Sequence, residues 1–234
     1  MRLVHILTLM TFAVCGVVCF APIAGAARKQ LWYNPRVDAV ASDVAGTSVR
    51  VDGEDDWTEW AGFVAPDDPY AVLGFTFPFA PSSSVLYHRI FISPSLWTTL
   101  DSAVDDGVQS GAPYDVAVAI MDMTHEAFHI RLVSGDEGRV NACALQAFPD
   151  VLTRDFGVSA TDVQTTTVPV QTRVRVKVRV KVRGRWAVRY QWKTKTSYQT
   201  STTTVPNATY TTLVSDAQAF YNSQPSPYST GTCW

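Results

Sequence analysis

The stretch of sequence that decides the fold covers residues 115–149 and reads DVAVAIMDMTHEAFHIRLVSGDEGRVNACALQAFP. Its first half is apolar over much of its girth, so we expect a buried helix with Asp115 as its N-cap. The Ser-Gly pair at 134–135 ends this helix. Asp136 then starts a second helix, which ends at Pro149 because proline disrupts a helix interior. The stretch therefore predicts two helices joined by a short turn.

Five residues of the first helix, HEAFH at 125–129, have the spacing of a metal site. His125 and His129 are four residues apart, so both imidazoles lie on one helix face and can reach one cation. Zinc prefers nitrogen and oxygen ligands, and a catalytic zinc site combines three protein ligands with water. Glu126 adjoins the first ligand, where its carboxylate can take a proton from that water. The alternative is a satisfied structural cluster or an inert metal site.

A third ligand is expected from the start of the second helix. Glu137 lies eight residues after His129, and two antiparallel helices joined by a short turn would bring it back beside the histidines. Asp136 is the rival, but its oxygen has a competing role as the expected N-cap. Glu137 itself has a second interpretation, as an acid that suits the positive end of the helix dipole.

These motifs resemble the minimal gluzincins, in which HExxH on one helix is followed by a glutamate ligand on the next. The matching residues are HEAFH and then EGRVNA at 137–142. The chain is also similar to exported actinobacterial proteins of unassigned function that have an HExxH helix, a Cys in the next helix and a Cys near the C-terminus. The resemblance covers residues 85–150. It departs from the family pattern at Val140, where Ala is usual, and at Cys143, where an aromatic residue is common.

The resemblance implies zinc ligation by His125, His129 and Glu137, with Glu126 as the general base. It implies an α+β fold with a small zincin-like core, made of the active-site helix, the ligand helix and a short sheet. It also implies that the strand around residues 89–93 is the edge along which a peptide substrate lies. Family members often have a Tyr or His that stabilises the oxyanion. Four residues remain open for that role: Tyr87, His88, Tyr190 and Tyr198.

The rest of the core is predicted from local patterns. Residues 31–51 alternate in short polar and apolar runs and are expected to be extended. Residues 85–93 (VLYHRIFIS) alternate well enough for a strand. A helix should start at Pro94 or Ser95 and end near Val104, followed by a turn-rich linker. A short helix is expected near residues 213–221.

Residues 174–182 read VRVKVRVKV, a strict alternation that predicts a β-strand. Residues 183–185 form a turn, and residues 186–195 return as a second strand. One face of this long hairpin is Val and the other is basic, and cations on opposite strands are expected to face and repel each other. The expected surface-binding residues are Arg173, Arg175, Lys177, Arg179, Lys181, Arg183 and Arg185.

Charge is divided unevenly along the chain. Residues 1–160 contain nine Lys and Arg and nineteen Asp and Glu, whereas residues 161–234 contain ten and two. The basic hairpin needs a counter-charge, which the acidic body, an anionic cell-wall or membrane surface, or an acidic substrate can supply. The plainer interpretation is a solvated edge that Lys and Arg protect from aggregation. No nucleic-acid partner is expected, because the chain has no binding motif for one.

The N-terminus has the pattern of a signal peptide. Arg2 precedes an apolar stretch at 6–20, and Ala24-Gly25-Ala26 is a small-x-small cleavage site, so the mature chain should start near Ala27. An uncleaved membrane anchor is the alternative. Export to an oxidising compartment favours a disulfide between the two remaining cysteines, Cys143 and Cys233. The localisation expected is secreted, extracellular or cell envelope.

Four segments follow from these patterns: a signal peptide at 1–26, a metallopeptidase core at 27–160, a basic arm at 161–204 and a returning tail at 205–234. The first functional hypothesis is a secreted zinc-dependent metallopeptidase that acts on a peptide or protein substrate. The second is a non-catalytic cell-envelope binding protein with a structural zinc site and a basic β-arm. Glu126 favours the first hypothesis, because an inert scaffold does not need a carboxylate there.

Overall fold

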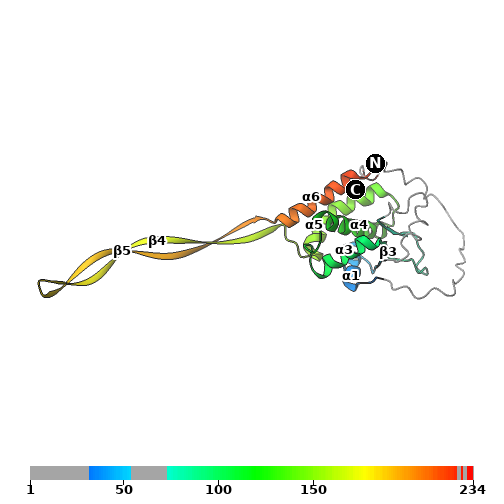
Figure 1. Cartoon of the computed structure of the whole chain (residues 1–234). Coiled ribbons are helices and arrows are strands. Elements are labelled where there is room, and N and C mark those ends of the chain that lie inside the picture. The colour runs from blue at the N-terminus through cyan, green and yellow to red at the C-terminus, as the bar shows by residue number, and fades with distance from the viewer. Residues whose placement is uncertain (1–31, 54–72, 226–227, 229–230, 234) are drawn as a thin grey trace. The chain divides into compact units, whose positions relative to one another are not determined.

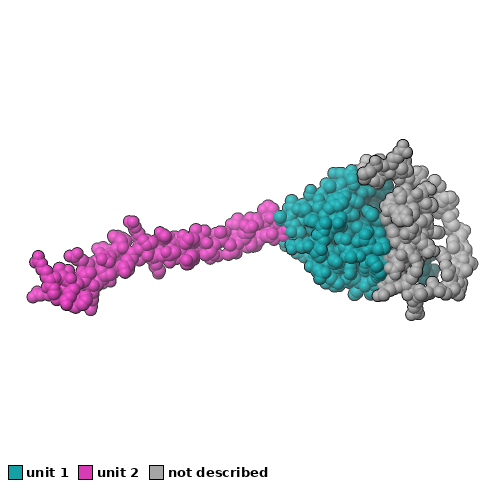
Figure 2. All heavy atoms as spheres, viewed as in Figure 1, with its two compact units in different colours: residues 1–159, 208–234 teal, residues 160–207 magenta. Residues whose placement is uncertain are grey.

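The computed structural model describes residues 32–53, 73–225, 228 and 231–233, so the expected signal peptide lies outside the described residues. The described chain is mixed α+β, with five helices and two small sheets. It divides into a body, residues 1–159 with 208–234, and a hairpin unit, residues 160–207 (Figures 1 and 2). Among the described residues, no helix has the length and apolar character needed to span a bilayer.

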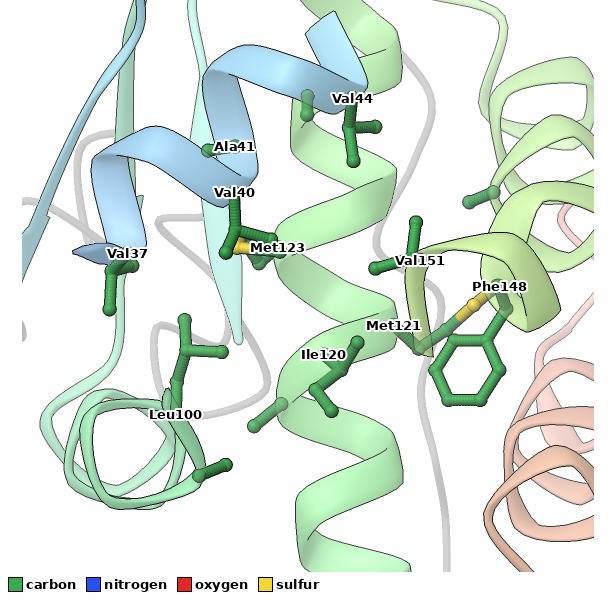
Figure 3. Packing of buried hydrophobic residues seen from close by; sticks show 14 of the residues in the cluster. Val37, Val40, Ala41, Val44, Leu100, Ile120, Met121, Met123, Phe148 and Val151 are labelled. Atoms are coloured by element: carbon green, nitrogen blue, oxygen red, sulfur yellow. The ribbon is translucent and has the colours of Figure 1, made fainter. Parts of the chain in front are cut away.

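Helix α4 (Pro113–Leu132) is the centre of the body, with fourteen buried residues among its twenty. The helices α1 (Pro35–Ala45), α3 (Pro94–Asp105), α5 (Glu137–Asp155) and α6 (Ala208–Ser223) all pack against it. In Figure 3, Met121 lies toward Phe148 of α5, and Leu100 of α3 lies across from Ile120. A helix enclosed on this many sides is expected to be apolar over much of its girth, as the sequence predicts.

Helix α1 corrects the expectation that residues 31–51 are extended. Asn34 accepts a hydrogen bond from the backbone N–H of Arg36 at 2.9 Å, and Pro35 occupies the first turn. The left-handed Gly46 (φ 70°) ends the helix. The buried residues of α1 recur at helical spacing: Val37, Val40, Ala41, Val44 and Ala45. Burial of this face and the two end signals outweigh the β preference of valine.

A three-stranded sheet completes the body. Its strands are β1 (Arg50–Gly53), β2 (Gly74–Thr76) and β3 (Arg89–Ile92), in the order β1-β3-β2. β3 pairs parallel with β1 and antiparallel with β2. The expectation that the strand at 89–93 is an exposed edge is therefore wrong, because β3 is central. Among the described residues the edges are β1 and β2. The strand is also shorter than expected, because residues 82–88 form turns.

The ends of α4 and α5 differ in part from the prediction. The N-cap of α4 is Ala112, so Asp115 lies in the first turn instead of capping it. Asp136 caps α5 as expected, but α5 continues through Pro149 to Asp155. The last turn buries Val151 and Leu152 completely. Each such burial contributes about 1.5–3 kcal/mol, which offsets the cost of about 3 kcal/mol for an internal proline. The α3 prediction is confirmed, and α6 is longer than the helix expected at 213–221.

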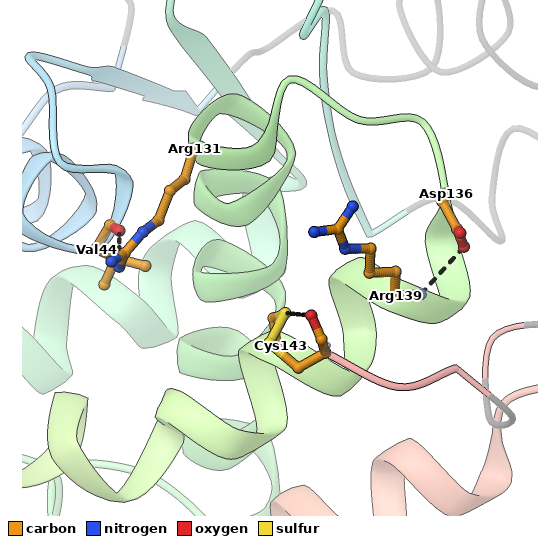
Figure 4. Close-up of a disulfide and its surroundings, with 6 residues drawn as sticks. Val44, Arg131, Asp136, Arg139 and Cys143 are labelled. Atoms are coloured by element: carbon orange, nitrogen blue, oxygen red, sulfur yellow. Dashed lines mark hydrogen bonds between the residues drawn. A yellow bond between two sulfur atoms is a disulfide. The ribbon is translucent and has the colours of Figure 1, made fainter.

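The C-terminal tail is fixed to α5 by the disulfide between Cys143 and Cys233 (Figure 4), as expected. Gly231 crosses the first turn of α5 so closely that an added Cβ would overlap the backbone of Gly138. Only a glycine fits at this crossing. The tail therefore lies along the helix that begins with Glu137.

The hairpin unit consists of β4 (Thr161–Val182) and β5 (Arg185–Pro206), each of twenty-two residues. The predicted hairpin is present and extends further toward residues 161 and 206 than its alternating sequence indicates. Arg183 and Gly184 form a two-residue turn with φ of 49° and 80°, the conformation that suits the twist of a hairpin. The expected repulsion between facing cations is wrong, because the register pairs no Lys or Arg with another.

Candidate metal centre

The site is a triangle of three potential ligand atoms on α4 and α5. The Nε2 atoms of His125 and His129 are 2.9 Å apart. Oε2 of Glu137 is 3.0 Å from Nε2 of His125 and 3.3 Å from Nε2 of His129. These three side chains can hold a metal ion. Asp136 is kept out of the group because it accepts the backbone N–H of Arg139 at 3.1 Å as the N-cap.

Hydrogen bonds on the far side of each imidazole orient the two rings. Nδ1 of His129 lies 2.6 Å from the carbonyl oxygen of Ser134, which can only accept, so Nδ1 must donate. Nδ1 of His125 lies 3.0 Å from Oδ1 of Asn141. With Nδ1 protonated on both rings, each neutral imidazole turns an Nε2 lone pair toward Glu137. Three electron pairs thus converge on one point, an arrangement that favours a cation there.

In the absence of a metal ion, a proton balances this charge. Burial lowers the pKa of His129, but the hydrogen bond to Glu137 and the charges of Glu126 and Glu137 together raise it to about 9. Burial would raise the pKa of Glu137, yet its hydrogen bonds to both histidines bring it down to about 2. Burial lowers the pKa of His125. These shifts favour an ionised Glu137 beside a protonated His129 imidazole in the metal-free site near neutral pH.

Glu126 lies beside the triangle without forming part of it. Its Oε1 is 3.9 Å from Nε2 of His125, and the residue is 5% exposed. Burial, first, and the charges of Asp122 and Glu137 raise its pKa, against the opposing effects of His129 and a hydrogen bond from the backbone of Thr76. A buried carboxyl with a raised pKa, next to a cation site, has the properties of a general acid and base.

Asp122 is a site residue that the sequence analysis did not single out. It lies one helical turn before Glu126, and its Oδ2 has no hydrogen-bond partner among the described residues. Gly74 of β2 leaves the space that this carboxyl fills, since a Cβ there would overlap Oδ2. Burial raises the pKa of Asp122 to about 7. The sequence did contain a signal for Asp122, since it is an acid among apolar residues of a helix, four residues before Glu126.

Tyr228 is the second residue that sequence reasoning missed. Its carbonyl oxygen accepts a hydrogen bond from Nδ2 of Asn141 at 3.4 Å, and Asn141 in turn contacts His125. Burial, and then the charges of Glu137 and Glu126, raise the pKa of its phenol, which stays neutral at all ordinary pH values. Of the residues first considered for stabilising an oxyanion, Tyr190 and Tyr198 belong to the hairpin unit. His88 stacks on Tyr87 and lies 3.5 Å from the hydroxyl of Thr47.

The chain matches no protein-family model, no curated protein and no solved structure.

Proposed function

We propose that this protein is a secreted zinc-dependent metallopeptidase with a minimal gluzincin-like core. The observation that supports this best is the convergence of His125, His129 and Glu137 with a separate carboxyl, Glu126, beside them. Ligand bonds of about 2.0–2.1 Å in a tetrahedral zinc site place the ligand atoms about 3.3 Å apart. The observed separations of 2.9–3.3 Å are close to that spacing, so small movements would admit the ion.

The number of ligands favours catalysis over a structural role. A structural zinc site is normally closed by four protein ligands, whereas the three ligands found among the described residues leave one position for solvent or substrate. A bound zinc ion supplies Lewis acidity, which activates water and polarises a peptide carbonyl. Glu126 takes a proton from the attacking water and returns it to the nitrogen of the leaving amine. Glu126 would be favoured in its ionised form, despite its burial, by the positive charge of an ion held at His125, His129 and Glu137.

Strand β2 is the edge that a peptide would use, in place of β3. β2 lies close to α4: Gly74 borders Asp122, and the backbone of Thr76 donates a hydrogen bond to Glu126. A substrate paired with β2 would present its carbonyls beside Glu126. Tyr228, with a neutral phenol near Glu137 and Glu126, is the candidate donor to the oxyanion. Export is supported by the disulfide, which is compatible with an oxidising compartment.

The test compares purified chains that begin at Ala27. The wild type should bind one zinc ion per chain and cleave casein or cell-wall peptides. Glu126→Gln should retain the zinc and lose activity by about 10²–10⁴-fold, because only proton transfer is removed. A full zinc load with no cleavage by the wild type would point to the non-catalytic envelope protein instead.

Glu137 and Asp136 are neighbouring acids, and a substitution at each one tests which of them is the third ligand. Glu137→Gln should weaken zinc binding strongly, since an amide oxygen is a poorer ligand than a carboxylate. Asp136→Asn should leave zinc binding unchanged, because asparagine also caps helices well. Zinc affinity measured by competition with a chromophoric chelator distinguishes the two. The ligand assignment is wrong if Asp136→Asn weakens binding and Glu137→Gln does not.

A further inference from the structure

The register of the hairpin unit places cations directly beside aromatic rings. Directly opposite residues of a β-ladder point to the same face. The row of five cations on β4 therefore shares its face with a largely aromatic row on β5. The pairs are Arg173 with Thr194, Arg175 with Trp192, Lys177 with Tyr190, Arg179 with Val188, and Lys181 with Trp186. The guanidinium of Arg175 also lies 4.4 Å from the ring centroid of Tyr190.

The other face has the reverse arrangement. Here β4 supplies the aliphatic row and β5 supplies most of the polar and charged partners. The pairs are Val174 with Lys193, Val176 with Gln191, Val178 with Arg189, Val180 with Ala187, and Val182 with Arg185. Both faces of the distal half, defined here as residues 173–195, thus combine apolar and cationic side chains. The distal half spans about 35 Å along each strand of a ladder.

The aromatic side chains of the distal half are open to solvent. Trp186 and Trp192 are 70% and 68% exposed, and Tyr190 is 54% exposed. Every residue of β4 and β5 is exposed or half-exposed, so the hairpin unit has no buried core of its own. Exposed tryptophans on a two-stranded ribbon indicate a surface that is completed by a partner.

The hairpin unit contains no adequate counter-charge. Between residues 160 and 207 the chain has ten Lys and Arg and a single acid, Asp162. That acid pairs in register with Val205, at the end of the ladder away from the turn. None of the ion pairs found among the described residues involves a hairpin cation. The partner is therefore anionic.

We propose that the distal half of the hairpin binds the surface of an anionic lipid bilayer. Lys and Arg contact lipid phosphates, while Trp and Tyr occupy the boundary between headgroups and acyl chains. The valine row favours this partner over others. Nucleic-acid bases and sugars stack on aromatic rings, but neither makes use of an aliphatic face. A bilayer interface accommodates aromatic, aliphatic and cationic side chains together, so both faces of the ribbon fit it.

The test uses the chain from Ala27 to Trp234, so that the apolar N-terminal stretch cannot contribute. We expect it to cosediment with phosphatidylglycerol vesicles and not with phosphatidylcholine vesicles, and to dissociate as salt is raised. Vesicles that contain brominated lipid should quench its tryptophan fluorescence. Replacement of both Trp186 and Trp192 by Phe should remove most of this quenching, which shows that the distal half enters the interface.

Matched variants separate the distal half from the rest of the hairpin. The triple variant Arg175→Gln, Lys177→Gln, Arg179→Gln should bind these vesicles about a hundredfold more weakly, at about fivefold for each cation. Tyr198→Ser is the control, because Tyr198 is 73% exposed but pairs with Pro169 and lies outside the distal half. It should bind like the wild type. Circular dichroism of each variant checks that it is folded.

Three results would overturn the proposal. The first is equal affinity for the two vesicle types, and the second is unchanged binding by the triple variant. The third is that the distal half binds something else in place of vesicles, either a single-stranded oligonucleotide or, at low salt, the acidic body of a second copy of this chain. None of these measurements needs a metal ion or peptide cleavage. Failure here would leave the proposed peptidase activity untouched, and failure of the peptidase test would leave the membrane proposal untouched.

Discussion

At the scale of single residues, burial is the main cause of the raised proton affinity of the proposed general base, and Asp122 adds to it. Its charge raises the pKa of Glu126, one helical turn away. Asp122→Asn removes that charge, so the pKa of Glu126 should fall. Because the base must be ionised to act, the acid limb of the kcat/KM profile should then move to lower pH by up to about one unit. Asp115→Asn, an exposed acid at the start of the same helix, is the control and should not move it. An unchanged acid limb in the profile of Asp122→Asn would contradict this role for Asp122.

His129 shows how the metal-free site depends on pH. Its pKa in the folded, metal-free protein is about 9, above the ordinary 6.5. Its contribution to stability is therefore complete below pH 6.5 and disappears as the pH rises through 9. The melting temperature of the metal-free protein should fall between pH 6.5 and 9. Over the same range zinc affinity should rise by up to about tenfold per pH unit. The reason is that a smaller fraction of the protein carries the His129 proton that zinc must displace. Glu137→Gln should weaken both trends, because it removes the largest of the contacts that raise the pKa of His129, and unchanged trends would contradict the geometry.

At the scale of elements, the crossing of the tail over α5 supports the site. Gly231 lies against the backbone of Gly138, next to Glu137, and Tyr228 hydrogen-bonds to Asn141 behind His125. Gly231→Ala must push the tail away, which disturbs both supporting contacts. We expect zinc affinity to fall by about tenfold, as for other residues that support metal ligands. Gly135→Ala is the matched control, because its Cβ would meet only Phe79 at an ordinary 3.7 Å. Equal affinities for the two variants would show that the tail does not support the site.

How far the elements could be predicted depends on whether the deciding force is local. The hairpin, α3 and the Asp136 cap follow from alternation, proline and capping, which act within a few residues. Pro149 misled the prediction because the burial of Val151 and Leu152 is decided by other helices. Helix α1 had its signals at Asn34, Pro35 and Gly46, but its valines favoured strands. The ligand residues lie on two helices joined by one short turn and could be inferred, whereas Asp122 and Tyr228 join the site through β2 and the tail.

At the scale of the whole molecule, the two units have opposite charge. Outside residues 160–207 the chain has nine Lys and Arg and twenty Asp and Glu, whereas the hairpin unit has ten and one. The body also holds every buried hydrophobic residue found in the described part of the chain. The hairpin unit contributes nothing to that core. The buried core and the candidate metal site thus belong to one unit, and the exposed aromatic and cationic side chains belong to the other.

This division predicts that the hairpin can be removed without loss of the body. The backbone N–H of Asn207 donates to the carbonyl of Ala160 at 3.0 Å, so the two ends of the hairpin are adjacent and a short Gly-Ser linker can join them. The chain without residues 161–206 should keep its disulfide, bind one zinc ion and melt within about 5 °C of the full chain, because none of the residues removed is buried. It should cleave a soluble peptide at the full rate and lose its affinity for phosphatidylglycerol vesicles. Calorimetry, zinc analysis and cosedimentation on the same preparation measure these properties. A shortened chain that cannot hold zinc would mean that the hairpin is part of the site, and the separation into two units would be wrong.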